Sequence, residues 1–309
     1  MRFILFMAIF TFFGSVMTWI TLSIFSAFTL GLYEISRKIS LKSAAPFEVL
    51  FLSVLVSGLI MLPGIFFTTK VPPFVHGWIF LKSFIICFSW AGEFFALKKT
   101  PLSFAVAVRS CGPLLTILMA LLFFKETPEL SQWGGILLIL SGYGYFAILA
   151  LRSNSQDKTE NIQLRFILLM FLSTILGTVS GGIDRYLLKT AQTPPETLLI
   201  WFSVYSLSIL IIPATVYYSV KKKTAVNNMQ WSWIIPLISI FLLVSDRIYF
   251  GALHDTESTL AVTGSLRRGS IIISVIGGGL LLKERNIRGK LVAACFVFAG
   301  LVFLKLFGE

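Results

Sequence analysis

Apolar segments about one bilayer long recur along the whole chain and restrict its fold more than any other feature. A helix rises about 1.5 Å per residue, so about 20 apolar residues cross about 30 Å of hydrocarbon. Ten such segments occur, at residues 17–37, 48–67, 76–97, 102–124, 132–151, 166–188, 197–218, 231–253, 258–282 and 289–307. The sequence therefore predicts an all-α polytopic membrane protein with ten transmembrane helices.

The composition excludes several classes of protein. Hydrophobic residues make up 56% of the chain and charged residues 13%, too few charges for the surface of an ordinary soluble domain. The net charge of +12 could suit nucleic-acid binding, but most of the Lys and Arg residues lie in short clusters between the apolar segments. We therefore expect the lipid bilayer and a small molecule as partners, and no nucleic acid.

Motifs for catalysis or metal binding are absent from the sequence. It contains no HExxH, GxGD or GxSG pattern and no P-loop, and its three cysteines lack the spacing of metal ligands. An intramembrane enzyme is therefore the least favoured class. The sequence predicts no metal site and no cofactor.

An internal repeat is the strongest signal in the sequence. The stretches RSCGPLLTILMALLFFKE (Arg109–Glu126) and RRGSIIISVIGGGLLLKE (Arg267–Glu284) align without a gap, with Arg109 opposite Arg267. Both place small residues at positions i, i+4 and i+8, on one face of a helix, where a neighbouring helix can pack closely. The chain is therefore expected to contain two related units.

The two units are expected to be antiparallel in the membrane. Five helices cross the membrane an odd number of times, so a second copy starts on the opposite side. Lys and Arg are concentrated in the loops after odd-numbered segments, so corresponding loops of the two halves have opposite charge bias, as inversion requires. The predicted organisation is an apolar N-terminal extension (1–16), a first five-helix repeat (17–152), a hydrophilic linker (153–163) and a second five-helix repeat (164–309).

The duplicated order resembles the drug/metabolite transporter superfamily, in particular its EamA-type ten-helix transporters. The resemblance extends over nearly the whole chain from position 17. It is carried by the repeat, by Glu126 and Glu284 at the ends of the fourth and ninth segments, and by the matching stretches Gly31–Lys38 and Gly182–Lys189. It implies a secondary carrier with a central cavity, in the cell (inner) membrane, as a monomer or a homodimer.

The orientation has two readings. The positive-inside rule puts the odd-numbered loops in the cytoplasm and both termini outside. Members of the family generally keep both termini in the cytoplasm.

Arginines in the middle of the apolar segments are the first candidates for function. An arginine at the centre of a spanning helix costs about 2.5–3.5 kcal/mol on insertion scales, so Arg109, Arg267 and Arg268 need a compensating role. Neighbouring helical residues point about 100° apart, so one of the adjacent pair can line a cavity while the other pairs with an acid. Asp246 and Glu93 are the expected partners. In the superfamily, phosphate-exchanging plastid translocators hold their anion with basic residues at matching places.

Aromatic residues accompany the two acids. Trp90 lies three residues before Glu93, and Tyr249 three residues after Asp246, so each aromatic ring shares a helix face with an acid. The predicted substrate site comprises Arg109, Arg267, Arg268, Trp90, Glu93, Asp246 and Tyr249.

A purely structural interpretation stays open, because the interior charges nearly balance and could form salt bridges that fix helix packing. The charges are Arg109, Arg185, Arg247, Arg267 and Arg268 against Glu34, Glu93, Asp184 and Asp246.

Two transport functions fit these features. The first is a secondary carrier of a small anionic or zwitterionic metabolite, such as an amino acid, a carboxylate or a phosphorylated compound, which guanidinium groups would bind. The second is an exporter of drugs or apolar amphiphiles, for which the acids and aromatic rings would matter more than the arginines.

Overall fold

A computed structural model describes residues 18–100, 105, 109–126, 128–156, 164–223, 233–281 and 287–307. The predicted N-terminal extension (1–16) and Glu284 lie outside these residues. Of the predicted linker (153–163), the described part, up to Gln156, continues the preceding helix.

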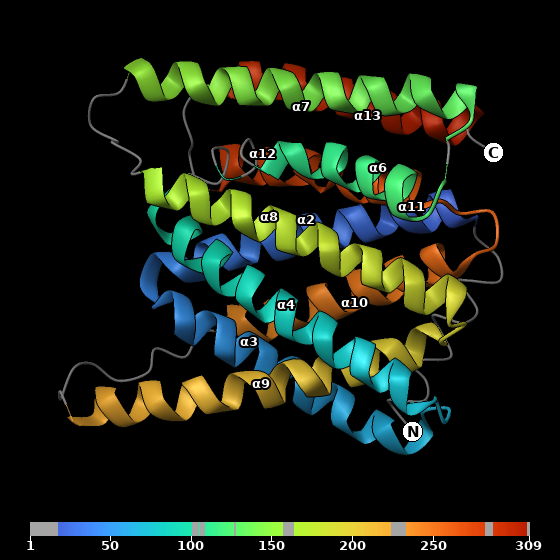
Figure 1. The fold of residues 1–309 in the computed structure, drawn as a ribbon. Coiled ribbons are helices and arrows are strands. Elements are labelled where there is room, and N and C mark those ends of the chain that lie inside the picture. Colours follow the sequence, from blue (N-terminus) through green and yellow to red (C-terminus); the bar gives the residue numbers. More distant parts are fainter. Residues whose placement is uncertain are drawn as a thin grey trace.

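The described chain is built of helices joined by short connections (Figure 1). In chain order these elements are α2 (Trp19–Ser43), α3 (Pro46–Met61), η1 (Leu62–Phe67), α4 (Pro73–Lys99), η2 (Arg109–Cys111), α6 (Gly112–Phe123), α7 (Leu130–Gln156), α8 (Leu164–Arg185), the π-helical turn η3 (Tyr186–Thr190), α9 (Pro195–Lys223), α10 (Ile234–His254), α11 (Leu260–Arg267), α12 (Ser270–Leu280) and α13 (Ile287–Phe307).

Within the described residues, seven segments are helical, long and apolar enough to cross a membrane. They are Trp19–Ser43, Pro46–Phe67, Pro73–Lys99, Arg165–Thr190, Pro195–Val220, Ile234–His254 and Leu260–Gly277. Gly112–Phe123 and Leu291–Leu304 are shorter apolar helices. The prediction of an all-α, multi-pass membrane protein is therefore confirmed.

Local sequence explains where several of these helices begin. Pro46 and Pro73 stand in the first turns of α3 and α4, where the missing N–H has no intrahelical partner to lose. Thr259 precedes α11, and its hydroxyl accepts a hydrogen bond from the backbone N–H of Val262 at 3.4 Å. A side-chain oxygen at this position bonds one of the free N–H groups of the first turn.

The ninth segment is divided, which the sequence analysis did not predict. Instead of one helix over 258–282, α11 ends at Arg267 and α12 begins at Ser270. Between them the backbone N–H of Gly269 donates to the carbonyl of Leu266 at 2.9 Å, an i to i+3 bond that tightens the helix. The fourth segment has a comparable 3-10 turn, η2, directly before α6. In the alignment of the two halves, the first residues of α6 and α12 coincide.

The helices are arranged in layers (Figure 1). The pair α7 and α13 lies along one side and the pair α3 and α9 along the other. Between them, α2 packs against α10 and α4 against α8. Each of these two contacts joins the first helix of one half to the third helix of the other.

Glycines bring α7 and α13 into backbone contact. A Cβ added to Gly142 of α7 would lie 2.8 Å from the carbonyl oxygen of Ala293, and one added to Gly300 of α13 would lie 2.7 Å from that of Gly135. Side chains at these positions would separate the helices, which is why small residues are favoured there.

Lysines at corresponding places in the two halves bind the ends of neighbouring helices. Lys38 of α2 donates to the carbonyl oxygens of Leu97 (2.7 Å) and Thr100 (2.5 Å), at the C-terminal end of α4. Lys189 of η3 donates to the carbonyl oxygens of Thr256 and Ser258, just after α10. A cation at the C-terminal end of a helix bonds the free carbonyls and opposes the negative end of the dipole.

Candidate functional site

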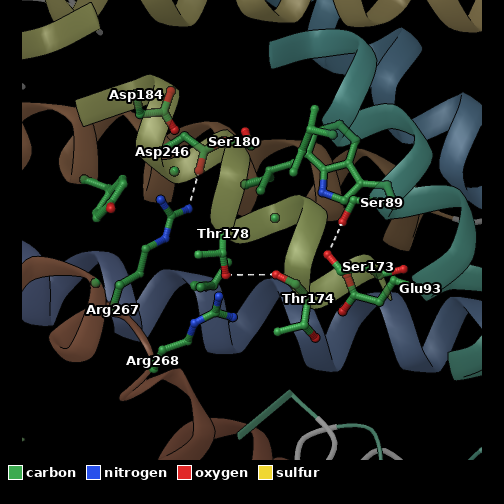
Figure 2. A pocket seen from close by; sticks show the side chains of 18 of the residues that line it. Ser89, Glu93, Ser173, Thr174, Thr178, Ser180, Asp184, Asp246, Arg267 and Arg268 are labelled. Atoms are coloured by element: carbon green, nitrogen blue, oxygen red, sulfur yellow. Dashed lines mark hydrogen bonds and ion pairs between the residues drawn. The ribbon is translucent and has the colours of Figure 1, made fainter. Parts of the chain in front are cut away.

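A cavity of about 180 Å³ lies at the centre of the helix bundle. Its walls come from α2, α4, α8 and α10, with further residues from η2, α6, α9, α11 and the turn after α11. Figure 2 shows charged and hydroxyl side chains from these elements turned toward the same space. The cavity is therefore formed by helices from both halves of the chain.

Four charged residues form a cluster on one side of the cavity, which we call the Glu93 cluster: Glu34, Arg37, Glu93 and Arg109. Glu93 accepts from Arg37 at 2.8 Å and from Arg109 at 2.5 Å. Arg109 also donates to Glu34 at 2.9 Å, and the second carboxylate oxygen of Glu34 accepts from the hydroxyl of Ser274. The two cations and two carboxylates balance.

A second group, the Asp246 cluster, comprises Lys82, Asp184, Asp246 and Arg267. The ammonium of Lys82 lies 3.1 Å from the carboxylate of Asp184, and the guanidinium of Arg267 pairs with Asp246. Both cations also lie over aromatic rings: Lys82 over Phe202, with its Nζ 3.4 Å from the ring centroid, and Arg267 over Tyr249, with its Cζ 4.1 Å from the centroid. This cluster also contains equal numbers of positive and negative charges.

Arg268 has no carboxylate partner within 4.0 Å in the described part of the chain. In Figure 2 a dashed line joins Arg267 to Asp246, and none of those drawn reaches Arg268. The guanidinium lies against Gly112, where an added Cβ would be 3.1 Å from its Cζ. The hydroxyl of Tyr143 donates to the backbone carbonyl of Arg268 and so holds the tight turn between α11 and α12. The residue lines the cavity.

Hydroxyl groups and one indole ring make up much of the neutral wall. The hydroxyl of Ser89 donates to the carbonyl oxygen of Ser173 at 2.7 Å, and that of Thr178 to Thr174 at 2.9 Å (Figure 2). Trp90 lies beside Phe202, with ring centroids 5.9 Å apart. The cavity thus offers both hydrogen-bonding groups and an apolar aromatic face.

All seven residues of the predicted substrate site line this one cavity: Arg109, Arg267, Arg268, Trp90, Glu93, Asp246 and Tyr249. The sequence indicated Glu93 and Asp246 as candidate partners without assigning them to particular arginines, and in the structure Glu93 pairs with Arg109 and Asp246 with Arg267. Arg109 and Arg267 are both neutralised by carboxylates, and Arg268 is the cation left over. That these residues bind a substrate stays a prediction.

Two cations of the site were missed in the sequence. Arg37 was placed at the very end of the first predicted segment, but α2 continues to Ser43, so Arg37 lies inside the helix and is only 1% exposed. Lys82 lies inside the third predicted segment and is 2% exposed. A lysine well inside an apolar segment has to face the protein interior, and this position was the indication in the sequence that Lys82 belongs to the site.

Two other interior arginines lie away from the cavity. Arg185 pairs with Glu126, whose second carboxylate oxygen accepts from the backbone N–H of Leu260 at 2.8 Å. Arg247 pairs with Glu196. For these two arginines, ion pairs that fix the packing of helices account for the charge in the protein interior.

The described residues contain no group of three or more His, Cys, Asp or Glu side chains placed to hold a metal ion.

Known structures share this fold. A solved crystal structure superimposes on the chain with a TM-score of 0.66 and 16% sequence identity, over 93% of this chain and 96% of the other. At this identity the likeness concerns the fold alone. A search of curated protein sequences found no match.

The sequence comparison with protein families gives the classification. The model of the EamA-like transporter family matches residues 17–148, which include α2, α3, α4 and α6 and most of α7. The matched helices supply the whole Glu93 cluster. Over residues 17–148 the chain is therefore similar to the EamA-like transporter family, which is a family of membrane transporters and not of enzymes.

Proposed function

We propose that this protein is a secondary transporter that carries a small anionic or zwitterionic metabolite, such as an amino acid, a carboxylate or a phosphorylated compound, across the cell membrane. One observation carries the proposal: in the described part of the cavity every carboxylate has a cationic partner, and Arg268 has no anionic one. An anionic group of the substrate would supply the missing charge.

The energetics of burial support this assignment. Arg268 is partly buried, and an uncompensated charge that is withdrawn from water costs several kcal/mol even after local relaxation. Arginine stays protonated, so it cannot escape this cost by losing its proton. Its planar fork of N–H donors matches the oxygens of a carboxylate or phosphate group. The transport site would therefore be at its lowest free energy with an anion against Arg268.

The two halves of the chain, 17–152 and 164–309, would be inverted five-helix repeats that move relative to each other. Three kinds of contact occur once in each half and support this repeat relation. In the helix packing, α2 contacts α10 and α8 contacts α4. In the ion pairs, Arg109 binds Glu93 and Arg267 binds Asp246, and one lysine from each half binds the end of α4 or of α10. Inverted-repeat carriers place their substrate between the repeats and expose it alternately to each side. The central cavity, with walls from both halves, suits this mechanism.

The alternative, an exporter of drugs or apolar amphiphiles, is less well supported. Such an exporter would attract cationic compounds with a free carboxylate in an aromatic cavity. Here Glu34, Glu93, Asp184 and Asp246 each lie in an ion pair.

Thermal stability of the purified protein tests the proposal, since a ligand that binds only the folded state raises its unfolding temperature. The compounds are amino acids, carboxylates, sugar phosphates, nucleotides and, for the alternative, cationic amphiphiles. An anionic class should stabilise the wild type and the Arg268→Lys variant but not Arg268→Gln. Arg165→Gln, which changes an exposed arginine outside the cavity, is the matched control and should respond like the wild type.

Uptake of the stabilising compound into proteoliposomes then distinguishes transport from binding. Stabilisation by cationic amphiphiles alone, unchanged in Arg268→Gln, would contradict the proposal and favour the exporter.

A further inference from the structure

We propose that the cavity selects substrates with a single net negative charge and discriminates against dianions and neutral compounds of the same shape. This inference rests on the proposed function and adds to it the number of charges that the site accepts.

The charges that line the cavity divide into two balanced groups and one remainder. The Glu93 cluster and the Asp246 cluster each contain two cations and two carboxylates joined by direct ion pairs. Arg268 belongs to neither. Within the described residues, the cavity as a whole therefore has a net charge of one positive unit.

Each ion pair ties up a cation that could otherwise bind a second anionic group. Arg37 and Arg109 share Glu93, and Arg109 also holds Glu34, so neither guanidinium is free without breaking a buried pair. Removing one partner of such a pair leaves an uncompensated charge in a medium where it is poorly solvated. A second negative charge on the substrate would meet four carboxylates and no unoccupied cation. Dianions should therefore bind less tightly than monoanions.

Neutral compounds are disfavoured for the opposite reason. With a neutral ligand in the cavity, Arg268 loses its contact with water and gains no counter-charge. A single anionic group compensates it, and a zwitterion does so only if its cationic group finds a place among carboxylates that are already paired.

The rest of the substrate would meet neutral walls. Trp90 offers an aromatic surface, and the hydroxyl groups of Ser89, Ser173, Thr174 and Thr178 offer hydrogen bonds. The cavity of about 180 Å³ limits the compound to a small molecule. A compact monoanion with an uncharged polar or aromatic body fits this description.

Two series of compounds that change charge at nearly constant shape test the inference. The first is succinamide, succinamate and succinate, and the second is trimethyl, dimethyl and methyl phosphate, in each case neutral, singly charged and doubly charged slightly above neutral pH. Dissociation constants for the purified wild-type protein should be lowest for the singly charged member. We expect at least a tenfold preference over the other two members, which corresponds to about 1.4 kcal/mol.

Variants that change the net charge of the cavity should move this optimum. Glu34→Gln raises the net charge by one while Arg109 keeps its bond to Glu93, so the doubly charged member should become the best ligand. Arg268→Gln makes the cavity neutral, so the neutral member should bind best. The charge-conserving variants Glu34→Asp and Arg268→Lys are the controls and should keep the wild-type order.

Folding is checked by size-exclusion chromatography in detergent. Asp246→Asn makes the same change in the other cluster and replaces Glu34→Gln if that variant aggregates.

The outcomes separate this inference from the proposed function. If the dianion of either series binds the wild type best, or if the order does not move in the variants, anion transport can stand but the charge rule is wrong. If none of the six compounds binds the wild type, the anion site fails and the charge rule fails with it.

Discussion

Replacing Gly142 by alanine should force α7 and α13 apart. The new Cβ would lie 2.7 Å from Cγ2 of Val297, 2.8 Å from the carbonyl oxygen of Ala293 and 3.0 Å from the backbone nitrogen of Val297. Two of these three atoms belong to the backbone of α13, so a rotamer change cannot relieve the clash, and the helices have to separate. Such a separation also loses the neighbouring contact between Gly135 and Gly300.

The magnitude follows from two opposing terms. Overpacking of a close contact costs about 1–3 kcal/mol. Alanine instead of glycine inside a helix gains up to about 1 kcal/mol, because the unfolded chain loses less backbone freedom. The expected result is a net loss of about 0–3 kcal/mol in the free energy of unfolding.

Gly144, two residues further along the same helix, provides the control. A Cβ there meets no atom within 4 Å, so Gly144→Ala has only the favourable term. The two variants should therefore differ by the overpacking cost, about 1–3 kcal/mol. The assay is equilibrium unfolding of each variant in the same detergent. Equal stabilities for the two variants would refute the close contact between α7 and α13.

Two further predictions concern polar contacts between helices. Lys38→Met and Lys189→Met should each lower the free energy of unfolding by about 1–3 kcal/mol, because each removes a charged donor from two carbonyls at a helix end. Thermal unfolding in detergent measures the loss. No change in either variant would contradict the capping role. Arg109→Gln should lower the free energy of unfolding by about 3–5 kcal/mol, because it leaves Glu34 unpaired, and adding Glu34→Gln should recover part of this loss. A double-mutant cycle measures the coupling energy between the two residues. Strictly additive losses would contradict the ion pair.

Much of the fold and of the cavity lining could be predicted from the sequence, because both follow from the hydrophobicity of the segments and from how deep each charged residue lies in its segment. The segments are apolar over the thickness of a bilayer, and the charges that interrupt them have to face the protein interior. For the same reason Arg109, Arg267 and Arg268 were expected in one site.

The pairing within the site could not be predicted, because it depends on which helices pack together. Nothing local in the sequence connects Arg109 with Glu34, 75 residues away. The angle between neighbouring residues indicated that Arg267 and Arg268 face different partners, but not which of them is left without an acid. A tight turn at Gly269 follows directly after the two arginines, and there the helix departs from the regular geometry on which that angle is based.

The close contact of α7 and α13 has a mechanical consequence. These are the last helices of the two halves, they touch through their backbones, and none of their described side chains lines the central cavity. A joint of this kind resists being pulled open but can rotate with little change in its contacts. If one half of the protein swings against the other, the pair would serve as the pivot, and the largest displacements would occur at the far edge, along α3 and α9 (Figure 1).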